Sequence, residues 1–167
     1  ATLDASAATG SVTFGYDGSE TAGTIGSEVA MTVTAGSGGL KALTGTGADT
    51  ITGGAGADHF TGAGGADSIT GGAGNDTISG GADNDVLSGG AGEDSITTGA
   101  GIDNVTGGAG NDTITVAANY TTDDTIDGGD GTDGLAITGT ASVKFSLSTI
   151  KYRATNIIPP KAIASSK

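Results

Sequence analysis

A nine-residue period in the middle of the chain constrains its fold more than any other feature. Two of the cleanest copies are residues 71–79, GGAGNDTIS, and residues 107–115, GGAGNDTIT. In register, repeats begin at Thr44, Gly53, Gly62, Gly71, Gly80, Gly89, Thr98 and Gly107. We interpret Val116-Ala117-Ala118 as a three-residue insertion, after which a degenerate repeat begins at Asn119 and a regular one at Gly128. A tandem glycine-rich turn followed by a short strand is typical of a solenoid.

Two positions of the repeat never vary in type. Position six is always aspartate: Asp49, Asp58, Asp67, Asp76, Asp85, Asp94, Asp103, Asp112, Asp124 and Asp133. Position eight is always apolar: Ile51, Phe60, Ile69, Ile78, Leu87, Ile96, Val105, Ile114, Ile126 and Leu135. We expect position eight to face the interior between two parallel sheets, with positions seven and nine facing solvent. A glycine-rich linker has no reason to keep an apolar residue at every ninth position.

The composition excludes an ordinary core. Of the 167 residues 34 are glycine, aromatic residues make up 4%, and Trp and Cys are absent. Glycine loses more backbone freedom on folding than any other residue, so something besides apolar burial must hold the chain together. Only two prolines and no Gly-X-Y period exclude collagen.

The charge distribution indicates bound cations. The net charge is −13, and residues 44–136 contain acidic residues but no Lys or Arg. Uncompensated negative charges at this density repel one another and oppose compaction unless cations bind. The same charge argues against a nucleic-acid partner.

Three segments follow from these patterns. Residues 1–43 form a β-rich flank continuous with the roll, with strand-like runs at 11–14 and 29–34. Residues 44–136 form the repeat block, and residues 137–167 form a C-terminal strand, near 142–147, and a basic cap or tail. No apolar run reaches the length of a membrane span. No Met and no signal-peptide pattern stand at Ala1, which indicates a processed end or a piece of a longer protein.

The repeat block resembles the RTX family of haemolysin-type calcium-binding repeats. This resemblance implies an all-β fold: a parallel β-roll, a right-handed solenoid with two nonapeptides per turn, with the flanking strands as extensions or caps. It also implies one calcium ion between successive turns on each edge. With five turns on each edge, up to about eight Ca²⁺ ions are expected.

Calcium prefers six to eight hard oxygen ligands, which carboxylates and backbone carbonyls supply. Alternate aspartates should line one edge, Asp49, Asp67, Asp85, Asp103 and Asp124, and the remaining five the other. All ten are predicted metal ligands. The turn glycines, which allow the positive φ of a sharp bend, complete the predicted metal site: Gly45, Gly47, Gly54, Gly56, Gly72, Gly74, Gly81, Gly90, Gly92, Gly99, Gly101, Gly108, Gly110, Gly129 and Gly131.

Some repeats depart from the pattern. Asp83 replaces a position-four glycine and is either an additional ligand or a solvated charge, while Ala63 replaces a position-two glycine with slight strain. The turn that begins at Asn119 has lost its glycines and is expected to bind calcium poorly. His59 is expected to be a solvent-facing strand residue, since a lone histidine builds no zinc site. Tyr152 and Arg153 are expected to pack in a terminal cap.

The sequence favours a structural role over catalysis. No cysteine exists, and the single histidine has no nucleophile to activate. We expect a calcium-dependent module of a secreted, extracellular bacterial surface protein, because the low-charge, Thr/Ser/Ala/Gly-rich flanks are similar in style to surface-layer proteins and permit self-assembly. One alternative is a C-terminal RTX module of an exoenzyme or toxin exported by type I secretion, although the basic tail differs from the usual acidic and apolar export signal. A segment of an adhesin extender or of a virion structural protein is the other.

Overall fold

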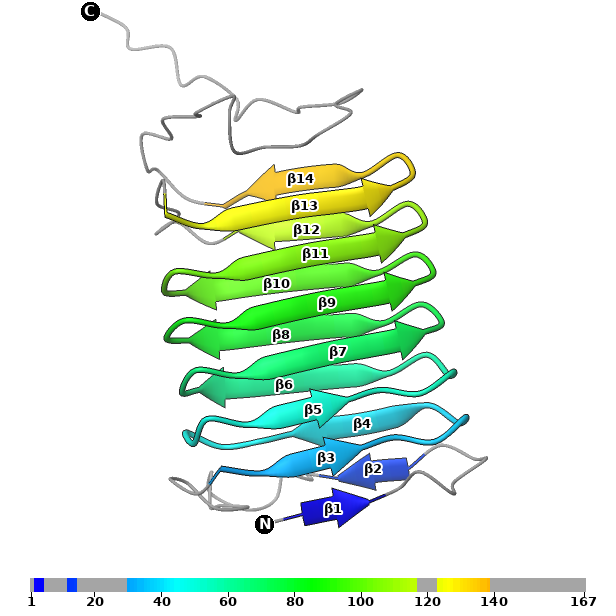
Figure 1. Ribbon diagram of the computed structural model, residues 1–167, viewed down its shortest axis with the longest axis vertical. Coiled ribbons are helices and arrows are strands. Elements are labelled where there is room, and N and C mark those ends of the chain that lie inside the picture. The colour runs from blue at the N-terminus through cyan, green and yellow to red at the C-terminus, as the bar shows by residue number, and fades with distance from the viewer. Residues whose placement is uncertain (1, 5–11, 15–29, 117–122, 139–167) are drawn as a thin grey trace, which may run out of the picture.

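The chain folds into two parallel sheets stacked face to face as a β-roll. The structure is a computed structural model that describes residues 2–4, 12–14, 30–116 and 123–138. Regular structure in these residues is entirely strand. Successive strands alternate between the two sheets, so each full turn of the chain adds one strand to each (Figure 1). The predicted parallel β-roll is therefore confirmed.

Each sheet contains seven strands in a regular order. The first sheet holds β1 (Thr2–Asp4), β3 (Thr32–Thr34), β5 (Thr50–Thr52), β7 (Ser68–Ala73), β9 (Val86–Ala91), β11 (Asn104–Ala109) and β13 (Thr125–Asp130). The second holds β2 (Val12–Phe14), β4 (Leu40–Leu43), β6 (His59–Gly64), β8 (Thr77–Ala82), β10 (Ser95–Ala100), β12 (Thr113–Val116) and β14 (Gly134–Ile137).

The register between strands follows the doubled repeat. Ile69 pairs with Leu87, the equivalent residue of the next turn. The offset lengthens by three where Asn104 pairs with Thr125, which confirms an insertion of three residues. Its position differs from the prediction, because Val116 lies in β12 and pairs with Ile137. The inserted residues therefore follow Val116, which keeps its place in the ladder because its side chain is buried in the core.

The core is a single column of side chains between the sheets. Position eight fills it as predicted: Ile51, Phe60, Ile69, Ile78, Leu87, Ile96, Val105, Ile114 and Ile126 are all buried. Leu135, in the last described strand pair, packs against the column but is only partly buried. Positions seven and nine face away from the core, and His59 is exposed as expected.

The roll extends below the first recognisable repeat. β3 pairs in parallel with β5, and β4 with β6, in the register of the later turns. Met31 and Leu40 stand one full turn before Asp49 and Asp58, at the position that aspartate holds elsewhere, and both side chains are buried. An apolar residue therefore replaces the carboxylate in this turn. The strand-like run at 142–147 and residues Tyr152 and Arg153 lie outside the described residues.

Candidate metal centre

The position-six aspartates form two hydrogen-bonded ladders, one along each edge of the roll. On one edge the backbone N–H of Asp49 donates to Oδ1 of Asp67 at 2.8 Å, and that of Asp67 donates to Oδ1 of Asp85 at 2.9 Å. Asp103 and Asp124 continue the same ladder. The ladder on the other edge links Asp58, Asp76, Asp94, Asp112 and Asp133. The alternation of aspartates between two edges is thus as the period predicts.

The second oxygen of most of these carboxylates has no partner. Among the described residues, six buried carboxylate oxygens accept no hydrogen bond, the Oδ2 atoms of Asp49, Asp67, Asp76, Asp85, Asp94 and Asp112. A buried acceptor left unsatisfied costs roughly 1–3 kcal/mol, and more when it is charged. A cation bound along each row would give these six oxygen atoms the partner that they lack.

Backbone oxygens converge beside these carboxylate oxygens. A Cβ added at Gly62 would collide with Asp67 Oδ2 and would lie 2.7 Å from the carbonyl oxygen of Gly80. Gly80 repeats the arrangement with Asp85 Oδ2 and the carbonyl of Thr98, at 2.6 Å from the added Cβ. We use the term cradle for this position beside a position-one residue. It is bounded by the Oδ2 of the same turn and by a carbonyl oxygen of the next turn. Its carboxylate and carbonyl donor set fits Ca²⁺.

Side chains alone do not surround an ion. Within the part of the chain that the structure describes, no three acidic or histidine side chains converge on one point. Coordination at either edge would therefore draw on backbone carbonyls together with the carboxylates, as the sequence predicts for these turns.

Burial and mutual repulsion make these carboxylates hard to ionise. Burial raises the pKa of Asp76 and of Asp85 to about 7, and that of Asp67 to about 6, against an ordinary value near 3.8. Ladder neighbours add repulsion, while the backbone N–H bonded to each carboxylate lowers its pKa. The pKa values of Asp94, Asp103 and Asp112 are raised mainly by burial. A divalent cation would oppose both effects by stabilising the charged form.

Left-handed backbone recurs at positions two and four of the central turns. Eleven of the predicted turn glycines have positive φ, Gly72, Gly74, Gly81, Gly90, Gly92, Gly99, Gly101, Gly108, Gly110, Gly129 and Gly131. The prediction of positive φ is wrong for Gly45, Gly47, Gly54 and Gly56, which are not left-handed. At Gly54 an added Cβ would instead collide with the carbonyl oxygen of Gly36, so close packing on the turn below is what requires glycine there.

Two sets of residues at the site were not predicted from the sequence. Gly65, at position four of the third repeat, has φ +92° and belongs with the turn glycines. The position-one glycines shape the cradle, because any side chain there would collide with Oδ2. Both sets could have been found from the sequence, since glycine recurs at those positions at the same period.

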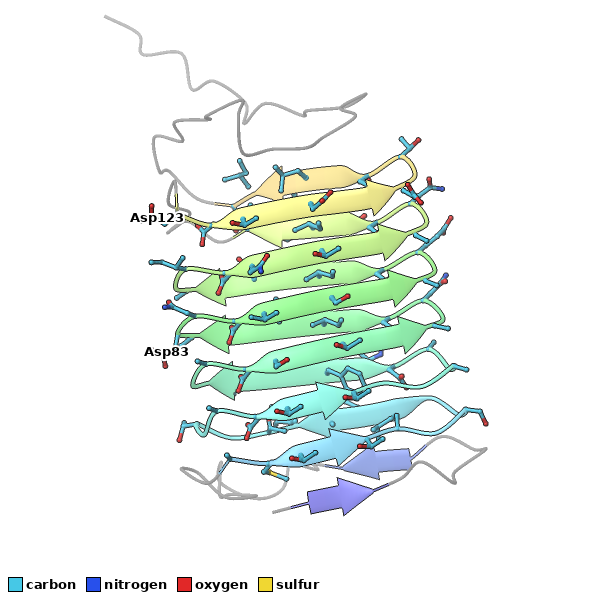
Figure 2. The ribbon with its side chains drawn as sticks, in the orientation of Figure 1. Asp83 and Asp123 are labelled. Carbon is cyan, nitrogen blue, oxygen red and sulfur yellow. The ribbon has the colours of Figure 1, made fainter. Side chains whose placement is uncertain are left out.

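The two irregular positions adopt strained backbone. Ala63 and Asp83 both have φ of 77° without being glycine. The carboxylate of Asp83 is exposed and accepts a hydrogen bond from the N–H of Gly65 at 3.1 Å. Asp83 and Asp123 both lie at the edge of the roll from which β9 and β13 begin (Figure 2). Asp83 also raises the pKa values of Asp67 and Asp85 by repulsion, so it deepens the negative potential of this edge.

The degenerate repeat keeps its place in the ladder. Residues 119–122 lie outside the described residues, but Asp124 is buried and accepts the N–H of Asp103 at 2.7 Å. The ladder therefore runs through this repeat, and whether its turn binds calcium stays a prediction.

These features define a class, a parallel β-roll with rows of buried carboxylate oxygens along its two edges. The family model of the RTX calcium-binding nonapeptide repeat matches in four copies, at residues 43–69, 61–96, 70–105 and 89–118. Residues 43–118 thus carry RTX calcium-binding nonapeptide repeats. No curated protein and no solved structure was found to match the chain. No helix in the described residues is long and apolar enough to cross a membrane.

Proposed function

We propose that the chain is a calcium-dependent structural module of a secreted bacterial cell-surface protein, which folds and becomes rigid when calcium binds at its turns. The observation that carries the proposal is the two rows of buried carboxylate oxygens that accept no hydrogen bond. Without cations these rows oppose folding, and with cations they bind one turn to the next. Metal binding that requires the folded state contributes directly to folding free energy.

The proposed ligands are the ten position-six aspartates together with backbone carbonyls of the turns. Extracellular calcium modules bind with dissociation constants of roughly 10⁻⁴ to 10⁻³ M. At that affinity the roll would stay unfolded in a low-calcium cytosol and fold outside the cell. The parallel pairing of β1 with β3 and of β3 with β5 supports a rod-like structural role, because these flank strands add to the same sheet as the repeats.

Calcium titration of the metal-free chain tests the folding role. We expect far-UV circular dichroism to show a cooperative gain of β signal at millimolar calcium, with little response to magnesium, which demands smaller and stricter octahedral geometry. No gain by about 10 mM calcium would contradict the proposal, given the affinity range of extracellular modules.

Assembly and location need separate measurements. Electron microscopy with and without calcium should show ordered sheets or filaments only with calcium if the module builds a surface lattice. Monodisperse particles under both conditions, together with an adjoining catalytic domain in the full reading frame, would favour an export and folding module of an exoenzyme instead.

A further inference from the structure

We infer that Asn75, Asn84 and Asn111 are positioning residues for calcium, because each holds the following turn in the orientation that keeps a backbone carbonyl between successive turns. All three stand at position five of the repeat, directly before a ladder aspartate. Their role rests on the calcium binding proposed above, and it falls to a position that supplies no predicted ligand.

These asparagines make the same contact with the next turn on their edge. The side-chain Oδ1 of each accepts the backbone N–H of the position-five residue one full turn later: Asn75 that of Glu93 at 3.0 Å, Asn84 that of Ile102 at 2.8 Å and Asn111 that of Thr132 at 3.0 Å. All three asparagine side chains are exposed, so these bonds are made on the outside of the turns.

The aspartate ladder supplies a matching bond in the opposite direction. The N–H of Asp76 donates to Oδ1 of Asp94 in the later turn at 2.8 Å, whereas the N–H of Glu93 donates to Oδ1 of Asn75 in the earlier turn. The same pair of bonds recurs at the other two asparagines. Two neighbouring residues therefore link each of these turns to the next, one bond in each direction.

The N–H that the asparagine holds belongs to a peptide group whose carbonyl faces the turn after it. In a trans peptide group the N–H and the C=O point in opposite directions, so fixing one fixes the other. The N–H of Glu93 shares its peptide group with the carbonyl of Gly92, and that carbonyl oxygen lies against Gly110 of the following turn. Asn75 therefore holds the Gly92 carbonyl between two successive turns, on the edge that carries Asp94.

The backbone conformation of position four divides in the same way. Gly65, Gly74 and Asp83 each precede a residue that stands one turn above an alanine, and their φ values are +92°, +109° and +77°. Alanine has no side-chain acceptor for the N–H. Gly110, whose next residue stands above Glu93, has φ +133°. The φ is largest where an asparagine holds the next N–H: +136° at Gly92, +144° at Gly101 and +142° at Gly131.

Release of calcium from the loaded chain tests this role. In Asn75→Ala the Gly92 carbonyl is no longer held, so about one ion should leave about two- to tenfold faster, which is the effect of losing one hydrogen bond. The remaining ions should leave at the unmodified rate. The measurement is stopped-flow mixing of the calcium-loaded chain with a fluorescent chelator. Thr77→Ala is the matched control, because Thr77 is exposed on the outer face of β8 and should change no rate.

Ala66→Asn tests the role in the opposite direction and remains informative if Asn75→Ala does not fold. Ala66 is exposed and stands one turn below Asn84, and Gly65 before it is left-handed like the residues before the asparagines. The new side chain should hold the N–H of Asn84 and slow the release of about one ion by about two- to tenfold.

The outcomes separate this role from calcium binding itself. If the unmodified chain binds calcium but neither substitution changes a release rate more than Thr77→Ala does, the asparagines are not positioning residues and the proposed function stands. Equal acceleration of every ion in Asn75→Ala would also overturn the role, because the asparagine would then support the whole fold and not one site. If the unmodified chain binds no calcium, the proposed function fails as well.

Discussion

The central turns and the turn formed by β3 and β4, which we call the N-terminal turn because it directly precedes the first repeat, share one backbone register but hold it in different ways. In the centre, a buried carboxylate occupies position six and left-handed glycines shape the turns. In the N-terminal turn Met31 and Leu40 occupy the same register position, and their N–H groups donate to Asp49 and Asp58 of the turn above. The first arrangement buries carboxylates that repel one another, whereas the second buries apolar side chains.

This comparison shows where the aspartate ladder ends. Asp49 and Asp58 still receive a backbone N–H from the turn below, so the hydrogen-bonded ladder closes on a residue that carries no charge. The turn below them buries Met31, Val33, Leu40 and Ala42 in the same column as the central isoleucines. The turn formed by β3 and β4 therefore continues the apolar core toward β1 and β2 without adding to the repulsion.

The largest expected effect comes from giving the N-terminal turn a carboxylate. Leu40→Asp places an aspartate in register with Asp58, but buried Ala35 stands at position one of that turn, where a cradle would need glycine. The charge would be buried with no ion to neutralise it, at a cost of about 3 kcal/mol or more. We expect a lower free energy of unfolding with or without calcium, measured by urea denaturation.

The control for this substitution is Leu43→Asp, because Leu43 is 36% exposed on the same strand and should change stability little. A gain of bound calcium and of thermal stability in Leu40→Asp would show instead that the apolar turn can be converted to the central kind.

The second expected effect is that stability depends on pH. This dependence should arise from the central turns and not from the N-terminal turn. Folding raises the pKa values of Asp67, Asp76 and Asp85 to about 6 to 7. In the calcium-free fold these carboxylates, when charged, lower the free energy of unfolding above that pH. The loss disappears as the pH falls toward the ordinary pKa of aspartate. We therefore expect more β signal at pH 5 than at pH 8 without calcium.

Calcium binding should respond in the opposite direction, because protons compete with the ion for the carboxylates. Below about pH 6, the calcium midpoint should rise by roughly tenfold per pH unit for each carboxylate that must lose its proton. A calcium midpoint that does not change between pH 8 and pH 5 would show that these carboxylates are not ligands.

The third effect separates charge from hydrogen bonding in the ladder. Asp85→Asn keeps an oxygen that can accept the N–H of Asp67 but removes the charge. We expect calcium binding at that edge to weaken by at least about tenfold, since even outer partners of metal ligands change affinity that much. Without calcium the variant should be more stable than the unmodified chain near pH 8, because a repelled and buried charge is gone.

Asp130→Asn is the matched control, since Asp130 is exposed and stands outside position six. It should leave both quantities nearly unchanged. Equal effects from the two substitutions, measured by calorimetric titration, would mean that net charge and not the ladder governs calcium binding.

The sequence predicted the central turns well because each structural requirement there is met by one residue type at a fixed position of the repeat. Burial of Ile78 and Ile96, and the ladder through Asp76 and Asp94, follow directly from positions eight and six. The nonapeptide pattern itself does not reach Met31 and Leu40, because apolar residues replace the aspartate there; only the strand-like run at 29–34 predicted a flank continuous with the roll. Strand pairing, which depends on contacts a full turn away, is what places these residues in the same register.

The turn conformations of residues 45–56 were mispredicted for a related reason. Their glycines match the central pattern, but β5 contains three residues whereas β7 contains six. Because glycine tolerates both left-handed and ordinary φ, its presence does not determine which one the chain adopts. In the lower turns, where the strands are shorter, these glycines adopt ordinary φ.

The smallest effect tests whether left-handed turns are a real requirement of the central region. Ala63 has φ of 77° at a position that glycine holds in the neighbouring central turns, so its Cβ is strained. Ala63→Gly should raise the free energy of unfolding by about 1 kcal/mol in saturating calcium. Ala66→Gly is the matched control, because exposed Ala66 has no positive φ and its replacement should lower stability by about 0.5–1 kcal/mol. If the two substitutions change the free energy of unfolding in opposite directions, backbone conformation, rather than glycine content, sets the stability of these turns. If both lower it equally, the central turns tolerate ordinary residues as the N-terminal turn does.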